Sequence, residues 1–290
     1  MSAPFDLIRA IVYTSITMLA FAGNSILCRM ALKEGTIDPA SFTSIRLFAG
    51  SVVLLLIVRV TSKESSIREH GGWVSAFMLF LYAVSFSYAY ISLSAGAGAL
   101  ILFGFVQGTM IAMALKAGDR PSIAEWLGWL LAFGGLVWLL LPGIEAPPAV
   151  GATLMALAGI AWGIYSIRGK KESNPLVSTC SNFVYSIVFV LFLTAITFSG
   201  ADMTERGIVL AVMSGAITSG VGYVIWYAAL EYLSAMQAAL VQLSVPAIAA
   251  VGGVLLLAEA ISVRLLVSGV LILGGIFLAL VQKSHRNTDH

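Results

Sequence analysis

The sequence predicts an all-α membrane protein, with ten transmembrane helices arranged as two inverted five-helix repeats around a central cavity. Composition is the first reason: 59% of the 290 residues are hydrophobic and 10% are charged, whereas about a quarter of the residues in soluble proteins are charged. The second reason is a series of apolar windows long enough to cross a bilayer. The third is a set of short patterns that recur at a constant distance along the chain.

The apolar windows divide the chain into ten expected helices, with bounds good to a few residues. The first five cover about 8–31, 40–60, 71–92, 94–116 and 122–141, and the second five cover about 148–168, 176–199, 206–230, 233–257 and 263–282. Prolines stand at or just before several starts, where the missing N–H costs little. These are Pro39, Pro121, Pro147 and Pro175.

The repeat is visible as matches 140 positions apart, such as Gly23 with Gly163 and Gly134-Gly135 with Gly274-Gly275. It predicts a first repeat at 1–141, a linker at 142–147, and a second repeat with a short cytoplasmic tail at 148–290. Because each repeat has five helices, the second enters the membrane upside down, and such transporters bind substrate near the midplane between the halves. Chance similarity among small apolar residues is the alternative.

The distribution of Lys and Arg predicts the orientation, because cytoplasmic loops are rich in these residues. Most of them lie at the termini and in the loops that share the side of the termini, so both termini are expected in the cytoplasm. The expected location is the bacterial inner membrane, with the lipid bilayer as a partner. The largest basic cluster is Arg168 to Lys171, so no nucleic acid is expected as a partner.

The carboxylates and histidines all fall in tails, loops or helix ends. A proton relay would place such a group at mid-membrane, so we expect transport without a carboxylate relay. No metal-binding or catalytic motif is present, and we therefore expect no enzyme activity, no cofactor and no metal.

The stretch from Glu231 to Glu259 is the most irregular of the expected helices. Gln242 lies near its middle, and Pro246 cannot donate a helical bond to the carbonyl of residue 242. The pattern predicts a kink that lines a cavity, since unsatisfied backbone is tolerated mainly there. The corresponding hinge of the first repeat is expected at Gly104 and Gly108, near Phe103 and Gln107.

Arg46 is the one charge well inside an expected helix. It could hold helix carbonyls or extend to the outer face, or it could bind a substrate carboxylate. Polar and aromatic residues on single helix faces complete a candidate cavity, although ordinary packing explains the aromatic ones about as well. The candidate lining residues are Asn24, Arg46, Tyr82, Phe103, Gln107, Trp162, Tyr165, Asn182, Tyr223, Trp226 and Gln242.

The Gly-Gly pairs of the helices at 122–141 and 263–282 carry no polar chemistry. They indicate either a scaffold or a homodimer formed through these two helices.

Several of these features together resemble the EamA branch of the drug/metabolite transporter superfamily, and within it the YddG-type exporters of aromatic amino acids and related metabolites. They are Phe21-Ala22-Gly23, Ala161-Trp162-Gly163, Pro39 with Arg46, and the Gly-Gly pairs. The resemblance implies a basket-like fold, with helices 1–4 and 6–9 around the cavity, helices 5 and 10 outside it, and gating by bending of helices 3, 4, 8 and 9. The first half has Ala22-Gly23 where the family has Trp-Gly.

The primary hypothesis is an inner-membrane exporter of amino acids, aromatic ones and also threonine or methionine, and of related small metabolites, working by alternating access. A multidrug exporter of lipophilic cations is the alternative, although it would need a membrane carboxylate. A lipid scramblase or a membrane-embedded enzyme is a third, from a different class.

Overall fold

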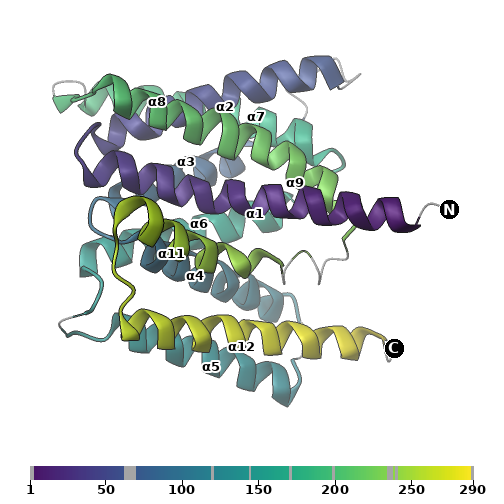
Figure 1. The fold of residues 1–290 in the computed structure, drawn as a ribbon. Coiled ribbons are helices and arrows are strands. Elements are labelled where there is room, and N and C mark those ends of the chain that lie inside the picture. Colours follow the sequence, from purple (N-terminus) through teal and green to yellow (C-terminus); the bar gives the residue numbers. More distant parts are fainter. Residues whose placement is uncertain are drawn as a thin grey trace.

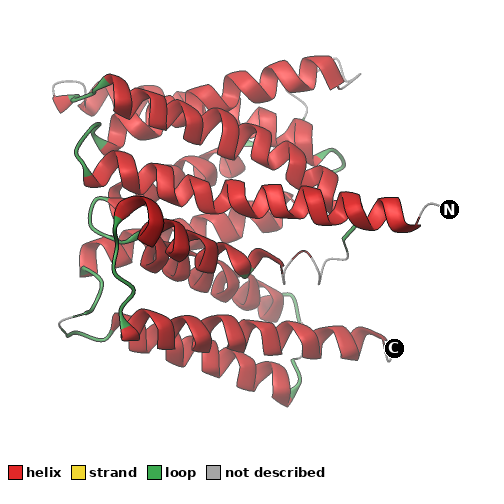
Figure 2. Ribbon diagram, viewed as in Figure 1, coloured by secondary structure: helices red, strands yellow, loops and turns green. Residues whose placement is uncertain are grey.

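The computed structural model describes residues 3–61, 70–118, 121–143, 145–169, 172–197, 200–233, 238 and 241–288, and the side chains within these ranges except those of 3–6 and 281–288. This part of the chain is almost entirely helical (Figure 2). Nine of its helices are long and apolar enough to cross a membrane. The predicted all-α membrane fold is therefore confirmed.

The helices follow the expected windows closely. In order they are α1 (Ala3–Lys33), α2 (Pro39–Thr61), α3 (Trp73–Tyr90), α4 (Ala95–Lys116), α5 (Ile123–Leu140), α6 (Ala149–Gly169), α7 (Pro175–Thr197), α8 (Glu205–Met213), η3 (Ser214–Val221), α9 (Gly222–Leu230), α11 (Ser244–Leu257) and α12 (Val263–Thr288). Local sequence accounts for several starts. Ser122 and Glu125 form a reciprocal capping box at the start of α5.

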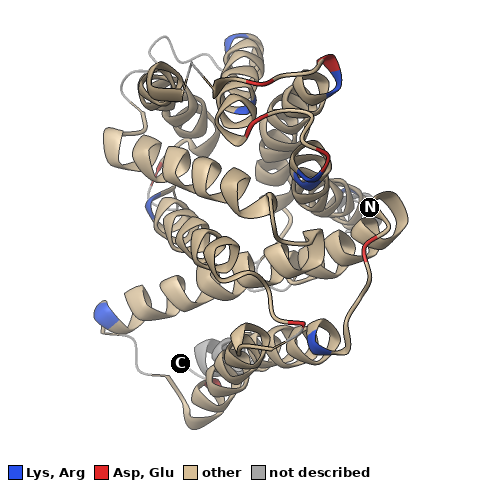
Figure 3. Cartoon of the chain, turned by 90° about the vertical axis from the view of Figure 1, so that its left-hand side faces the viewer, with Lys and Arg blue, Asp and Glu red and all other residues tan. Residues whose placement is uncertain are grey.

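Both termini lie on one face of the helix bundle (Figure 1). We call the opposite face, formed by the loop residues 34–38, 91–94, 141–143, 145–148, 200–204 and 258–262, the distal face. Figure 3 looks onto it and shows the acidic residues in loops and at helix ends. Helices α1 to α4 pack against α6, α7, α11 and the η3 segment. The first and second halves of the sequence therefore share one core.

Helices α5 and α12 pack mainly against each other, at one edge of the bundle (Figure 1). Their backbones touch at two glycines, because a Cβ on Gly128 would lie 2.6 Å from the carbonyl oxygen of Gly275. Gly135 likewise faces Leu271, whereas Gly134 and Gly274 have nothing within 4 Å of such a Cβ. One glycine of each pair thus serves packing within the chain. The homodimer through these helices stays a prediction.

The span from Glu205 to Leu230 is not a regular α-helix. Its middle third, Ser214–Val221, is a π-helix, a conformation that is rare and often found at functional sites. Gly215 allows close approach here, because a Cβ at this position would clash with the carbonyl oxygen of Arg46 on α2. The sequence reasoning expected an uninterrupted helix at 206–230 and did not predict this segment.

The kink expected at Pro246 takes a different form. A turn at Leu243 precedes α11, which begins at Ser244, so Pro246 occupies the first turn of a helix. A first-turn proline removes no helical hydrogen bond, since N–H groups there have no intrahelical acceptor. The helix is thus interrupted at Leu243, between Gln242 and Pro246, instead of being kinked within a continuous helix. The gating role of Pro246 stays a prediction. Residues 234–237, 239 and 240 of the expected helix at 233–257 lie outside the described residues.

Candidate functional site

A small cavity lies in the middle of the bundle, between helices of both halves of the chain. Apart from Leu102, its wall consists of aromatic rings and neutral polar side chains. The lining residues are Phe21, Asn24, Ser25, Tyr82, Phe86, Leu102, Phe103, Trp162, Thr218, Ser219, Tyr223 and Gln242. The cavity has a volume of about 40 Å³. This is enough for a few water molecules. A larger compound needs the walls to move apart.

A chain of hydrogen bonds crosses the wall of this cavity and joins four helical segments, η3, α1, α3 and α2. Ser214 of the π-helical segment donates to Asn24 Oδ1 at 2.7 Å. The amide nitrogen of Asn24 donates to the Tyr82 hydroxyl at 3.3 Å. Arg46 Nη2 donates to the same hydroxyl at 3.2 Å. These hydrogen bonds hold the Tyr82 hydroxyl between the neutral amide of Asn24 and the cation of Arg46.

Arg46 lies behind the cavity wall rather than in it. Its side chain is 2% exposed, and its guanidinium carbon lies 5.2 Å from the ring centre of Tyr82 and 5.1 Å from that of Phe86. Nε and Nη1 have no hydrogen-bond partner. Ion pairs in the described part of the chain involve other residues. Within the described residues, the cation therefore has aromatic faces and one hydroxyl around it, but no counter-charge.

Aromatic rings form the apolar wall. Trp162 lies 4.8 Å from Tyr82 and stacks on Tyr223 at 5.6 Å, measured between ring centres. Tyr223 in turn contacts Phe21 at 5.8 Å. Rings at these separations attract each other and give a rigid surface suited to another ring or to an apolar side chain.

Gln242 contributes the polar group at another part of the wall. Its Nε2 donates to the carbonyl oxygen of Ala238 at 3.0 Å. This bond leaves the side-chain carbonyl oxygen of Gln242 as a hydrogen-bond acceptor in the wall of the cavity.

The cavity is closed toward the distal face by two layers. The first is a column of α3 aromatics, in which Phe86 lies 5.3 Å from Tyr82 and 4.7 Å from Tyr90. Phe86 and Tyr90 are almost completely buried.

The second layer, which we call the distal latch, is the ion pair of Arg29 with Glu259, at 2.9 Å with side chains 12% and 9% exposed. Arg29 also donates to the backbone carbonyls of Tyr90 and Ile91. Glu259 accepts from the backbone N–H of Ala95 at 2.8 Å. The latch thus joins α1 and the ends of α3 and α4 to the end of α11.

Comparison with known proteins identifies the family. The model of the EamA-like transporter family matches residues 8–141 and 149–281. This chain belongs to the EamA-like transporter family. Membership indicates a multi-span membrane transporter rather than an enzyme.

Relatives of this EamA-like transporter include an uncharacterized protein of Pseudomonas aeruginosa, PA1977, which is 45% identical over 96% of each chain. The uncharacterized transporter YoaV of Bacillus subtilis is 21% identical over 86% of this chain and 90% of that protein. A solved crystal structure covering 95% of this chain and 98% of its own has a TM-score of 0.64 at 16% identity, which shows a shared fold.

In this EamA-like transporter the candidate residues from the sequence divide into two groups. Asn24, Tyr82, Phe103, Trp162, Tyr223 and Gln242 line the cavity. The others stand outside that wall: Arg46, Gln107, Tyr165, Asn182 and Trp226.

The contacts of the second group show what these side chains do. Tyr165 donates to Thr179 at 3.4 Å, and Asn182 accepts from the backbone N–H of Gly72 at 2.9 Å, which fixes the start of α3. Trp226 supports Phe21 edge-on at 5.9 Å. These contacts are typical of side chains that stabilise the fold.

The hinge candidates Gly104 and Gly108 lie in α4, which is continuous here. Their role in bending stays a prediction.

Thr218 and Ser219 line the cavity from the π-helical segment, and sequence reasoning missed both. The available signal was a run of small and polar residues, Ser214-Gly215-Ala216-Ile217-Thr218-Ser219-Gly220, in the middle of an apolar span. Such a run weakens a helix and supplies hydroxyls where lipid offers none.

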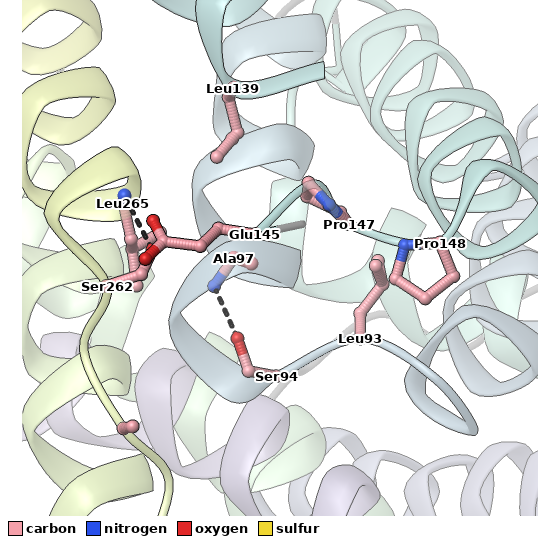
Figure 4. A pocket seen from close by; sticks show the side chains of 10 residues that line it. Leu93, Ser94, Ala97, Leu139, Glu145, Pro147, Pro148, Ser262 and Leu265 are labelled. Atoms are coloured by element: carbon pink, nitrogen blue, oxygen red, sulfur yellow. Dashed lines mark hydrogen bonds between the residues drawn. The ribbon is translucent and has the colours of Figure 1, made fainter. Parts of the chain in front are cut away.

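A larger cavity of about 230 Å³ lies on the distal face, between the linker and the starts of α4 and α12 (Figure 4). Its serines are already used as helix caps, since Ser94 accepts from Ala97 N–H and Ser262 from Leu265 N–H. Glu145 extends toward Ser262 across this space. The cavity is separate from the central one and shares no lining residue with it.

Proposed function

We propose that this protein exports amino acids and related small metabolites across the bacterial inner membrane by alternating access. On this view it acts like the YddG-type exporters. The observation that carries the proposal is the central cavity, which combines an aromatic wall with a few neutral polar groups. An apolar side chain suits the rings, while the backbone-like end of an amino acid suits Asn24, Tyr82 and Gln242.

Alternating access on this proposal uses the two repeats, 1–141 and 148–290, as the moving parts. The distal latch supports this idea because Arg29 belongs to the first repeat and Glu259 to the second. The cavity is too small here for an amino acid, so substrate entry requires the halves to separate. With cytoplasmic termini, the distal face is periplasmic and substrate leaves through the opened latch.

The proposal also concerns energy coupling. Its support is that the lining of the central cavity, as far as the structure describes the chain, contains no acidic side chain and no histidine. A carrier that exchanges protons for lipophilic cations needs such a group at the binding site. Transport is therefore proposed to run down the substrate gradient.

The test is efflux from proteoliposomes loaded with labelled phenylalanine, threonine or methionine. We expect release down the gradient, with the rate little changed by an imposed pH difference. Trp162→Ala, which removes the ring that contacts both Tyr82 and Tyr223, should slow release. No efflux of any of the three amino acids, or equal efflux by this variant, would contradict the proposal.

A further inference from the structure

We propose that the compound bound in the central cavity must carry a carboxylate, which Tyr82 contacts directly and for which Arg46, behind it, provides the positive charge. The inference rests on the proposed function and adds to it a rule for substrate selection. Tyr82 is the binding residue on this view, and Arg46 is a residue that determines specificity without lining the cavity.

The first step is the missing counter-charge of Arg46. The guanidinium is buried, and two of its three nitrogens have no hydrogen-bond partner. An arginine stays protonated in proteins. A buried cation without an anionic partner is unfavourable, and attraction to an anion is stronger in a low-dielectric interior than in water. The site therefore gains most from a ligand that brings a negative charge.

The second step is the hydrogen-bond state of the Tyr82 hydroxyl. Its oxygen accepts from Asn24 Nδ2 and from Arg46 Nη2. A phenol has one hydrogen to donate, and neither of these nitrogens can accept it, since both are donors. Tyr82 lines the cavity, so its O–H remains for a ligand. The adjacent cation polarises this O–H and strengthens it as a donor to a carboxylate.

The third step is what the rest of the wall offers. None of the described residues that line the cavity is acidic, and one N–H of Gln242 Nε2 donates to the Ala238 carbonyl oxygen. An ammonium group finds the Gln242 carbonyl oxygen and the aromatic faces, which are neutral partners. A free amine would thus enter a site of positive charge without compensation, whereas an amino acid brings its own carboxylate.

The experiment measures direct binding, so that it does not depend on transport. The purified protein in lipid nanodiscs is titrated with 3-phenylpropionate and with 3-phenylpropionamide, which differ only at the carboxylate. The signal is intrinsic fluorescence, because Trp162 forms part of the cavity wall. A hydrogen bond to a charged group is stronger than one to a neutral group, so the acid should bind at least about tenfold more tightly than the amide.

Two variants test the residues. Tyr82→Phe removes the hydroxyl and keeps the ring contacts with Trp162 and Phe86. Arg46→Gln removes the charge. Both should bring the affinities for acid and amide to within about threefold of each other. Tyr227→Phe is the matched control, because its hydroxyl bonds to Thr179 outside the cavity wall, and it should keep the wild-type preference.

Each outcome decides the question. Equal binding of acid and amide by the wild type, absence of acid binding, or an unchanged preference in Tyr82→Phe would overturn the inference. Circular dichroism and gel filtration of Arg46→Gln establish whether it folds, and Tyr82→Phe carries the test if it does not. Preferred binding of acids without efflux from proteoliposomes would leave the inference standing and refute the proposed export.

Discussion

Replacing Glu259 by glutamine removes the negative charge of the distal latch while keeping the size of the side chain. The Arg29 side chain, which is 12% exposed, is then held only by the carbonyls of Tyr90 and Ile91. The glutamine can still accept from the N–H of Ala95. Breaking a buried ion pair costs about 3–5 kcal/mol, and the retained bond places this change near the lower value, at about 3 kcal/mol.

The substitution destabilises only the state in which the distal face is closed, because the ion pair between Arg29 and Glu259 forms in that state. The open state should therefore gain population on the order of a hundredfold, as long as it remains the minor state. Cys28 reports the change, because it is fully buried and directly precedes Arg29 on α1. With Cys180→Ser as the background, the rate of Cys28 labelling by a water-soluble maleimide in nanodiscs should rise by a similar factor.

The exposed ion pair between Arg206 and Glu34 is the matched control. It also lies on the distal face, but its side chains are 59% and 38% exposed. Exposed pairs contribute at most about 1 kcal/mol, so Arg206→Ala should change the labelling rate by less than about sixfold. If Glu259→Gln labels Cys28 no faster than Arg206→Ala does, the latch does not hold the distal face closed.

Three further changes test packing and local structure. Gly275→Ala should lower the thermal unfolding temperature clearly, since its Cβ would meet the backbone of α5, whereas the neighbouring Gly274→Ala faces open space and should leave that temperature unchanged. Gly215→Ala should destabilise the fold by about 1–3 kcal/mol in denaturant unfolding, because the added methyl clashes with the Arg46 carbonyl; a wild-type midpoint would contradict the close approach of α2 and the π-helical segment. Ser122→Ala removes the cap of α5 and should cost about 1 kcal/mol in the same measurement, with Thr153→Ala, an exposed hydroxyl in α6, as the control.

The sequence by itself determined where most of the spans lie. Hydropathy needs only a window of about 20 residues, so α2, at Pro39–Thr61, was predictable as 40–60. Local signals also sufficed for caps, because Ser122 and Glu125 are three residues apart. A hydrogen bond within one turn of helix joins residues that are close in the sequence, so its formation depends little on the tertiary structure.

Only the tertiary structure decided which side chains meet in the cavity. In a membrane helix every face is apolar, so no hydrophobic stripe indicates which face points inward. Arg46 could have faced lipid headgroups, the cavity or another helix, and its place behind Tyr82 depends on the rotation of α2 against α3. The same holds for the latch, whose partners are 230 positions apart, and for Gln242, which lines the cavity directly before the turn at Leu243.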